Sequence, residues 1–447
     1  MHTVQKRSNS EPGLDMVCGV DLSGPMEARL TPGVRTLFAD LGQTADAMGC
    51  ALYVVGGWPR DLLLNRSNVD VDVVLEGDGV AFAEAFVSEK GGRVVRHERF
   101  RTAMIVLEDG CKVDVVSARR ERYDRPGALP TMQLSGIEQD LYRRDFTINS
   151  MAIQLNAAGY GRLVDLFGGR RDLEQKTVRV LHERSFVEDP TRMMRAVRFE
   201  QRFGFRMERT TERLLRRAAA DRMLERVSSE RIREELIRLL REERPFKPLL
   251  RLDELGVLHA LHPGLRADGD RKDLFARIGE ALSWFEKKHP DDVVDRWMLF
   301  FLGLMDALEV EEKRAFAEKL NMHRKVRELV REIGRFVEVG TPLTEARIPP
   351  SRIYRLLKPM KTESVLFLMA RTTEESIKQR IALYLDQLRK VSIEISGRDL
   401  SNMGIPKGPI FRTILDGLLE AKIDGKVGSR AEEGAWAGKM WRALGEA

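Results

Sequence analysis

The hydrophobic pattern of this 447-residue chain changes its period part-way along its length. Short apolar runs at 52–55 and 103–107 predict strands, and the segment 80–90 between them predicts a helix. From about Phe186 onward, apolar residues recur every three or four positions, which predicts helices almost throughout. Two such stripes are Ile232, Leu236, Leu239 and Leu240, and Ile381, Tyr384, Leu385 and Leu388. The expected fold class is therefore α+β, with a small domain on a mixed sheet followed by a long all-α remainder.

The composition restricts the class of protein further. Hydrophobic residues make up 43% of the chain, which is enough to bury real cores, and the net charge of +6 is compatible with a nucleic-acid partner. The 3 cysteines are odd in number and widely spaced, which excludes a disulfide framework and a cysteine-based zinc site. No stretch approaches the roughly twenty apolar residues of a membrane span, and residues 1–12 lack the apolar core of a secretory signal. We therefore expect a cytoplasmic protein without a membrane segment.

A glycine pair followed by an acidic strand is the most informative segment. Gly56-Gly57 follow an apolar run and precede Pro59, which suits a first helical turn, so the pair should lie between a strand and a helix. Backbone N–H groups at such a junction favour a phosphate. Asp70 and Asp72 then lie two apart in an alternating run, so their carboxylates should project from one face of a strand.

Carboxylates on one strand face beside apolar residues repel each other unless a cation joins them. Two divalent metal ions that hold a nucleoside triphosphate would do so. An exposed sheet edge with solvated acids is the alternative interpretation of an isolated Asp-x-Asp pattern. Asp114, within the β-branched run 112–116, supplies a third acid on a strand and favours the metal hypothesis.

The pattern Gly-Gly-x-x-Arg-Asp followed by Asp-x-Asp resembles the head of the class II tRNA nucleotidyltransferases and bacterial poly(A) polymerases, a polymerase-β-like family. Four further blocks of the family pattern occur in order between about Leu52 and Leu265. They are Arg143-Arg144-Asp145-Phe146-Thr147-Ile148-Asn149, the Asp-x-x-Gly-Gly-x-x-Asp-Leu block at 165–173, Glu188-Asp189-x-x-Arg192, and Ser229-Glu230-Arg231-Ile232. One such block could arise by chance, but five in order could hardly do so.

The resemblance implies a role for each of these positions. Asp70, Asp72 and Asp114 would be the catalytic acids, with Asp70 and Asp72 bridging two Mg²⁺ ions. The residues implied to bind the nucleotide are Gly56, Gly57, Arg60, Arg143, Arg144, Asp145, Asn149, Asp189, Arg192, Arg195 and Arg198. The implied reaction is attack of an RNA 3′-hydroxyl on the α-phosphate of CTP or ATP, without a covalent enzyme intermediate.

Asp189 and Arg192 suggest how a base is chosen without a template. Asp189 precedes Pro190, which predicts a helix N-cap followed by a first-turn proline. Cytosine and adenine both present an amino donor beside a ring-nitrogen acceptor, and a carboxylate with a guanidinium matches that pattern. Uracil and guanine present a carbonyl beside an N–H and would be rejected. A single helical arginine is more often solvated or ion-paired, so the resemblance carries this assignment.

We expect five segments along the chain. They are a flexible extension at 1–27, the nucleotidyltransferase head at 28–176, a neck with base-recognition helices at 177–250, a helical body at 251–345 and an RNA-binding helical tail at 346–447. Arginines are dense between Arg192 and Arg251, where neighbouring glutamates predict ion pairs within helices. In the tail, 396–409 resembles the family's turn that grips the outer corner of tRNA. An ordinary turn before a helix at 410–419 is the alternative.

The predicted function is template-independent, metal-dependent addition of C or A nucleotides from CTP or ATP to the 3′ end of tRNA. The alternatives are a poly(A) polymerase acting on general RNA, an RNA-binding protein without catalysis, and nucleotidyl transfer to a small molecule. The motifs leave open whether CC, A or the whole CCA is added, because these activities share them and the choice depends on the loop between about Val115 and Arg143. The oligomeric state is also left open.

Overall fold

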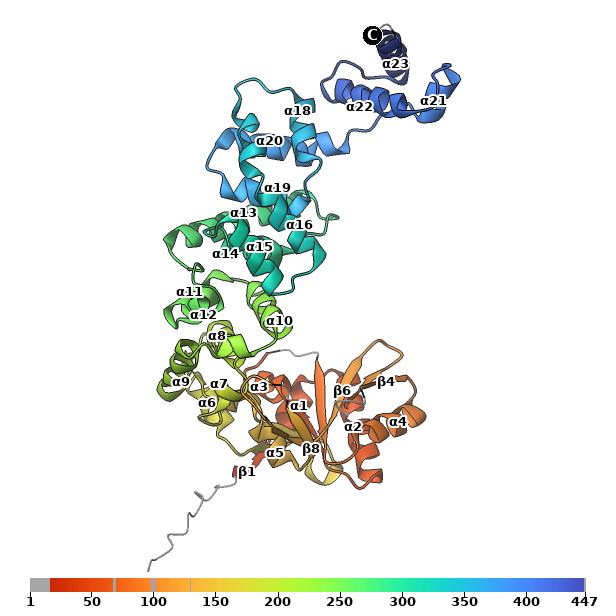
Figure 1. Ribbon diagram of the computed structural model, residues 1–447. Helices are drawn as coiled ribbons and strands as arrows, with labels where there is room; N and C mark the ends of the chain where they lie inside the picture. Colours follow the sequence, from red (N-terminus) through yellow and green to blue (C-terminus); the bar gives the residue numbers. More distant parts are fainter. Residues whose placement is uncertain (1–16, 67–69, 98–101, 129, 446–447) are drawn as a thin grey trace, which may run out of the picture. The chain divides into compact units, whose positions relative to one another are not determined.

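The computed structural model describes residues 17–66, 70–97, 102–128 and 130–445 (Figure 1). Contacts between residues divide the chain into two compact units. The first comprises Met1–Glu235 and Arg251–Leu261, and the second comprises Leu236–Leu250 and His262–Ala447. The predicted α+β class is confirmed, because the first unit contains a mixed sheet and the second is helical. The finer division into neck, body and tail stays a prediction.

The main sheet of the first unit has eight strands in the order β1-β10-β9-β2-β3-β6-β5-β4. Its strands are β1 (Val17–Asp21), β2 (Leu52–Val55), β3 (Val71–Leu75), β4 (Arg93–His97), β5 (Thr102–Val106), β6 (Lys112–Ser117), β9 (Ala152–Gln154) and β10 (Arg162–Asp165). Two small sheets pair β7 (Arg119–Arg122) with β8 (Thr131–Leu134), and β11 (Thr177–Val178) with β12 (Arg206–Met207). In the main sheet β3 and β6 are parallel, and the other neighbouring strands are antiparallel.

The helices of the first unit cover this sheet and continue the chain beyond it. They are α1 (Ser23–Arg29), α2 (Pro32–Ala47), α3 (Gly57–Leu63), α4 (Gly79–Lys90), α5 (Ile137–Tyr142), α6 (Gly169–Glu174), α7 (Ser185–Glu188), α8 (Arg192–Phe203), α9 (Arg209–Ala220) and α12 (Val257–Leu261). Helices α10 (Ser229–Leu240) and α11 (Phe246–Glu254) have residues in both units. Short 3₁₀ turns are η2 (Thr147–Asn149), η3 (Ala157–Gly159) and η4 (Met223–Arg226).

The two faces of the main sheet are buried by different helices. Helix α4 packs against β4, β5 and β6 (Figure 1), and its Phe82 and Phe86 are almost fully buried. On the other face Leu141 of α5 packs with Tyr53 and Val74. Because successive residues of a strand point to opposite faces, Asp72 shares the α5 side with Val74. The sheet therefore presents its acids beside α5 and the residues that follow it.

The expected flexible extension over 1–27 is wrong for the part of it that the structure describes. β1 pairs antiparallel with β10 at the sheet edge, and α1 follows directly. Met26 of α1 is fully buried. The pairing of β1 and the burial of Met26 order this segment, although its Ser-, Pro- and Gly-rich composition does not predict such order. Residues 1–16 of that prediction lie outside the described residues, as does Val69 of the predicted acidic strand.

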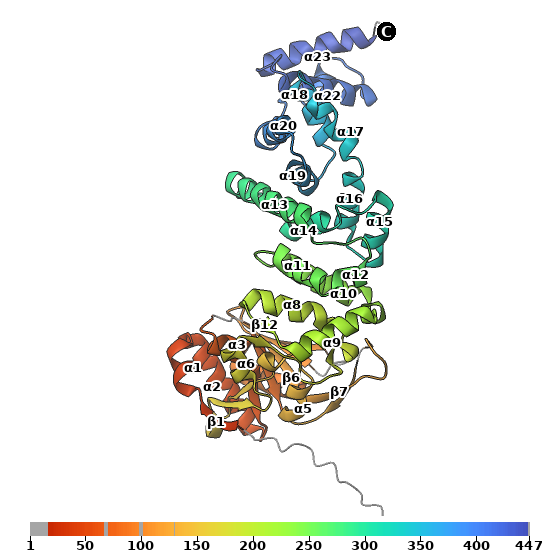
Figure 2. The ribbon, with the colours of Figure 1, turned by 90° about the vertical axis from the view of Figure 1, so that its left-hand side faces the viewer.

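The second unit is built from helices throughout. They are α13 (Gly269–Lys288), α14 (Arg296–Leu304), α15 (Val310–Lys319), α16 (Arg324–Ile333), α17 (Phe336–Gly340), α18 (Pro350–Leu357), α19 (Thr362–Arg371), α20 (Glu375–Asp386), α21 (Gly397–Asn402), α22 (Pro409–Ile423) and α23 (Arg430–Gly445), with 3₁₀ turns η5 (Pro342–Thr344) and η6 (Leu388–Lys390). Helix α13 packs against α14 and α19 (Figure 2). Both stripes predicted from the sequence are buried. Of the helices in the described part of the chain, none has the length and apolar content to cross a membrane.

Candidate active site

Two of the three predicted acids are brought together by the only parallel strand pair among the described residues of the main sheet. β3 and β6 run in register, with Asp72 the direct partner of Asp114. Asp70 lies just before β3 and is exposed. Burial raises the pKa of Asp72, the neighbouring carboxylates of Asp114 and Asp70 raise it further, and Arg144 opposes them. These two central strands thus concentrate negative charge that a cation would relieve.

The glycine pair lies at the predicted junction. β2 ends at Val55 and α3 begins at Gly57. Gly56 has a φ of +71°, in the left-handed region that favours glycine. A Cβ placed on Gly56 would lie 3.5 Å from a carboxylate oxygen of Asp72 and 3.5 Å from Nη1 of Arg144. The glycine backbone therefore adjoins both the acid and the arginine.

Within the described residues, no three His, Cys, Asp or Glu side chains form a group that could hold a metal ion unaided. A nucleotide-bound divalent ion does not need such a cage, because phosphate oxygens and waters supply most of its ligands beside one or two carboxylates. The partly buried Asp72, with acids on both sides, supplies hard oxygen donors of the kind Mg²⁺ prefers. The residues present thus fit a divalent cation.

Asp140 holds the two adjacent arginines of the Arg-Arg-Asp block in different directions. Arg143 donates from Nε and Nη2 to Oδ1 of Asp140 (2.9 and 2.7 Å), and Arg144 donates from Nη2 to Oδ2 (2.9 Å). Burial alone would raise the pKa of Asp140, but Arg144 and Arg143 outweigh it and the pKa is lowered. Arg143 also donates to Glu121 of β7 (2.9 Å), whereas Arg144 adjoins Gly56. Asp140 therefore orients Arg144 toward the acids.

A buried chain of polar side chains joins four of the other predicted nucleotide-binding residues. Arg60 donates to Asn149 (2.6 Å), Asn149 donates to Asp145 (2.9 Å), and Arg195 donates twice to Asp145 (2.9 and 2.6 Å). The guanidinium of Arg60 also donates to Asp61 and lies 4.8 Å from the ring centre of Phe203. Burial alone would raise the pKa of Asp145, but Arg195 and the Asn149 amide outweigh it, so the pKa falls to about 2. These residues connect α3 and η2 with α8.

Arg195 and Arg198 both continue this chain to Glu235 of α10, at 3.2 Å each. Arg192 points elsewhere: it donates to the Ser185 hydroxyl (2.7 Å) and to the backbone carbonyl of Arg143 (2.7 Å). These three arginines of α8 therefore do not form one solvated stripe. Arg195 and Arg198 share Glu235, whereas Arg192 contacts a different part of the first unit.

Asp189 and Arg192 are each fixed by separate partners. Asp189 accepts from the backbone N–H and hydroxyl of Thr191 (3.1 and 2.6 Å) and pairs with Arg231 (2.7 Å). The backbone N–H of Arg192 donates to the carbonyl of Asp189 (3.1 Å), but among the described residues their side chains share no hydrogen bond, so both side chains keep capacity for a base. The expected N-cap role of Asp189 is wrong, because a tight turn delays the helix to Arg192 and Thr191 is the N-cap.

A cavity of about 660 Å³ lies beside Asp70. Its apolar wall includes Val34 of α2 and Trp58 and Leu62 of α3, and Arg66 and Lys112 supply positive charge. Helix α2 thus forms part of the cavity wall beside Asp70. Of the three predicted acids, Asp70 lines this cavity, whereas Asp72 and Asp114 are not among its lining residues.

Comparison with known proteins decides the family. Residues 52–179 match the model described as the poly A polymerase head domain, and residues 204–268 match a probable RNA and SrmB-binding site of polymerase A. An A-adding tRNA nucleotidyltransferase of Halalkalibacterium halodurans is 34% identical over 398 residues, which are 87% of this chain and 88% of that protein. The chain belongs to the tRNA nucleotidyltransferase and poly(A) polymerase family.

Other members of the family match over most of the chain. An A-adding tRNA nucleotidyltransferase of Geobacter sulfurreducens is 41% identical over 91% of this chain, which spans only 47% of that protein. A CCA-adding enzyme in an apo form has 34% identity and a TM-score of 0.81 over 97% of this chain and all of that one. The Thermotoga maritima CCA-adding enzyme in complex with tRNA has 33% identity and a TM-score of 0.76 over 95% of this chain and 100% of that one.

Sequence reasoning missed three residues around the nucleotidyltransferase motifs. Asp140 precedes Arg143 and Arg144 by the three and four positions that favour helical ion pairs, a signal that could have identified it. Glu121 and Tyr123 lie on and after β7 with no such signal. Burial raises the pKa of Tyr123, as do Glu121 and, more weakly, Asp189, while Arg192 lowers it, so the β7–β8 segment reaches the proposed base-selecting pair.

The buried Asp145–Arg195 pair gives a testable prediction for this family member. We expect Asp145→Asn to lower the free energy of unfolding of the first unit by about 2–3 kcal/mol at pH 7. The folded-state pKa of about 2 lies below the ordinary value of 3.8, so this stability is present above about pH 4 and is lost as the pH falls toward 2. Urea unfolding with hydrogen exchange read on α8, at pH 7 and in steps below pH 4, measures it.

Asp221→Asn is the matched control for Asp145→Asn. Asp221 pairs with Arg217 at 3.8 Å, and the two side chains are 51% and 82% exposed. Such a surface pair contributes less than about 1 kcal/mol. Equal destabilisation by the two substitutions would contradict a special contribution from the Asp145 network.

Proposed function

We propose that this protein transfers AMP from ATP to the 3′ end of tRNA in the cytoplasm, completing the CCA sequence. The observation that carries the chemistry is the parallel register of β3 and β6, which sets Asp72 against Asp114 beside Gly56 and Arg144. The relatives with 41% and 34% identity over most of this chain are named A-adding enzymes, which supports adenosine as the added nucleotide.

In the proposed reaction the RNA 3′-oxygen forms a bond to the α-phosphorus of ATP. The bond from that phosphorus to the β-phosphate oxygen breaks, pyrophosphate leaves, and the hydroxyl proton passes to solvent. Asp70, Asp72 and Asp114 would hold two Mg²⁺ ions, which lower the pKa of the attacking hydroxyl and stabilise the charge on the phosphates. Arg144, oriented by Asp140, would add positive charge beside the same acids.

Base selection is assigned to Asp189 and Arg192. The adenine amino group would donate to the Asp189 carboxylate, and the guanidinium of Arg192 would donate to the ring nitrogen. Arg231, Thr191, Ser185 and the Arg143 carbonyl hold the two side chains in place. Fixed partners favour selection because a mismatched base would leave buried polar groups unpaired.

Addition of CC or of the whole CCA sequence is the second candidate. It is favoured by the near-complete overlap with solved CCA-adding enzymes. Cytosine presents the same donor and acceptor pattern as adenine, so the pair described above would accept either base. Tailing of general RNA with ATP would give the same chemistry with a different acceptor.

A comparison of acceptors tests the transfer itself. With Mg²⁺ and labelled ATP, we expect incorporation of a single nucleotide into a tRNA transcript ending in CC and little into an unstructured RNA of equal length. Removal of divalent ions with EDTA should abolish incorporation, and added Mg²⁺ should restore it. Long tails on both RNAs would instead identify a poly(A) polymerase, and full activity in EDTA would refute the metal assignment.

A further inference from the structure

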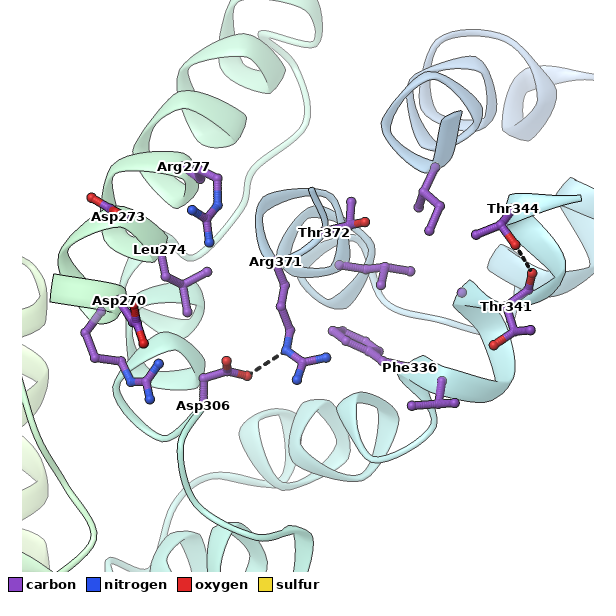
Figure 3. Close-up of a pocket in the computed structure, with 15 residues that line it drawn as sticks. Asp270, Asp273, Leu274, Arg277, Asp306, Phe336, Thr341, Thr344, Arg371 and Thr372 are labelled. Atoms are coloured by element: carbon purple, nitrogen blue, oxygen red, sulfur yellow. Dashed lines mark hydrogen bonds and ion pairs between the residues drawn. The ribbon is translucent and has the colours of Figure 1, made fainter. Parts of the chain in front are cut away.

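The second unit contains a cavity that the transfer reaction does not use. It has a volume of about 580 Å³ and lies among α13, α17, α19 and the start of α20. Arg277 of α13 and Arg371 of α19 both line it, and Figure 3 shows the guanidinium of Arg371 between Asp306 and Phe336. All residues that line it belong to the second unit, so the cavity is complete within that unit.

Both arginines are anchored at one nitrogen and leave the ends of their guanidinium groups available. Nε of Arg277 donates to the backbone carbonyl of Ala370 (2.8 Å), and Nε of Arg371 donates to Oδ1 of Asp306 (2.8 Å). Among the described residues the Nη atoms of both have no protein partner. A guanidinium fixed at Nε presents its remaining N–H groups with little loss of side-chain freedom, which suits a phosphate.

The cavity is lined by three arginines, Arg271, Arg277 and Arg371, and by three aspartates, Asp270, Asp273 and Asp306. Nε of Arg271 is buried at the cavity without a partner among the described residues. Burial lowers the pKa of the nearby Lys313, and Arg371 and Arg271 lower it further, against Asp306 and Glu309. The acids Asp270 and Asp273 also line the cavity but are exposed, and Figure 3 shows Asp273 turned away from Arg371.

The remaining wall is suited to an organic phosphate. Three threonines line it, Thr341, Thr344 and Thr372, beside the buried ring of Phe336. The Thr344 hydroxyl already donates to the backbone carbonyl of Thr341 (2.8 Å; Figure 3), which leaves the hydroxyls of Thr341 and Thr372 as donors. Hydroxyls and guanidinium groups donate to phosphate oxygens, while an apolar surface accepts a sugar or base.

We propose that this cavity binds a phosphate group, with Arg277 and Arg371 as its ligands. One source of this phosphate rests on the proposed function: it is a phosphate of the tRNA backbone, away from the reacting 3′ end. A free phosphate has the same chemistry, so the experiment distinguishes the two sources.

The test measures binding of a full-length tRNA transcript to the whole protein at several salt concentrations. Arg277→Gln should weaken binding about 10-fold and reduce the slope of log affinity against log salt by about 1. Arg371→Lys, which keeps a cation beside Asp306, should weaken binding in the same direction. Arg324→Gln is the matched control, because its side chain is 89% exposed and its loss changes the net charge equally. A parallel experiment measures, for the same variants, the rise in Tm that inorganic phosphate causes.

Weaker tRNA binding in the two cavity variants but not in the control would establish an RNA phosphate site. Unchanged tRNA binding with loss of the phosphate-dependent Tm rise in Arg277→Gln would establish a site for free phosphate. If neither measurement separates the cavity variants from Arg324→Gln, the proposal is wrong. AMP addition by the unaltered protein reports on the proposed function separately, because binding does not require turnover.

Discussion

Replacing Asp72 by asparagine is expected to lower AMP incorporation by about 10³-fold, corresponding to about 4 kcal/mol of transition-state stabilisation. Asp72 lies between Asp114, its partner across the parallel pair, and Asp70. The amide keeps the shape of the side chain but loses the charge that would hold divalent ions at the phosphates. Single-turnover incorporation of labelled ATP into a tRNA ending in CC measures the effect.

Binding of tRNA should survive the Asp72 substitution, since the acid is not expected to contact the body of the RNA. Asp78→Asn is the matched control. Asp78 caps α4 by accepting from the backbone N–H groups of Val80 and Ala81 (2.9 and 3.2 Å), and asparagine caps equally well. Near-normal activity of Asp72→Asn, or an equal loss in Asp78→Asn, would contradict the assignment of the acids.

Alanine at Asp189 or at Arg192 is expected to relax the choice of base. The ratio of kcat/KM for ATP over that for UTP or GTP should fall by about 10²-fold or more, because the polar groups that reject the wrong base are removed. The dependence on Mg²⁺ should change little, since neither side chain is assigned to the metal ions. Steady-state kinetics with each of the four nucleoside triphosphates measure this ratio.

Arg184→Ala is the control for the base-selection variants. Its side chain is 72% exposed and pairs with Glu188 at 3.4 Å, one turn before Asp189. We expect unchanged discrimination in this variant, with circular dichroism used to verify that all three variants are folded. Continued exclusion of UTP and GTP in both Asp189→Ala and Arg192→Ala would refute this account of base selection.

Much of the head could be predicted because its sequence patterns are local. Alternation of acidic and aliphatic residues identified β3, a short apolar run identified β5, a β-branched run indicated β6, and the glycine pair marked the junction before α3. The pairing of β3 with β6 could not be predicted from the sequence, because it depends on the path that the chain takes through α4, β4 and β5 between the two strands. The sequence therefore identified Asp72 and Asp114, and the fold makes them direct partners.

The side-chain network was harder to predict from the sequence, because its contacts join segments that are far apart along the chain. Glutamates in 229–240 were expected to pair within helices, yet Glu235 pairs with Arg195 and Arg198 of α8. Arg60 was expected to bind the nucleotide, whereas in the structure its guanidinium donates hydrogen bonds to Asp61 and Asn149. Motif matching identifies a position but does not give the partners of its side chain, so the nucleotide-binding roles stay predictions.

The most direct test of the central claim uses three tRNA transcripts, which end at the discriminator base, after one C and after two Cs. Each is offered labelled ATP alone, CTP alone, or both, with Mg²⁺. We predict that one AMP is added to the transcript ending in CC and that CTP is not used on any of them. Stepwise use of CTP on the shorter transcripts would show CC or CCA addition instead. No incorporation into any transcript would contradict the account as a whole.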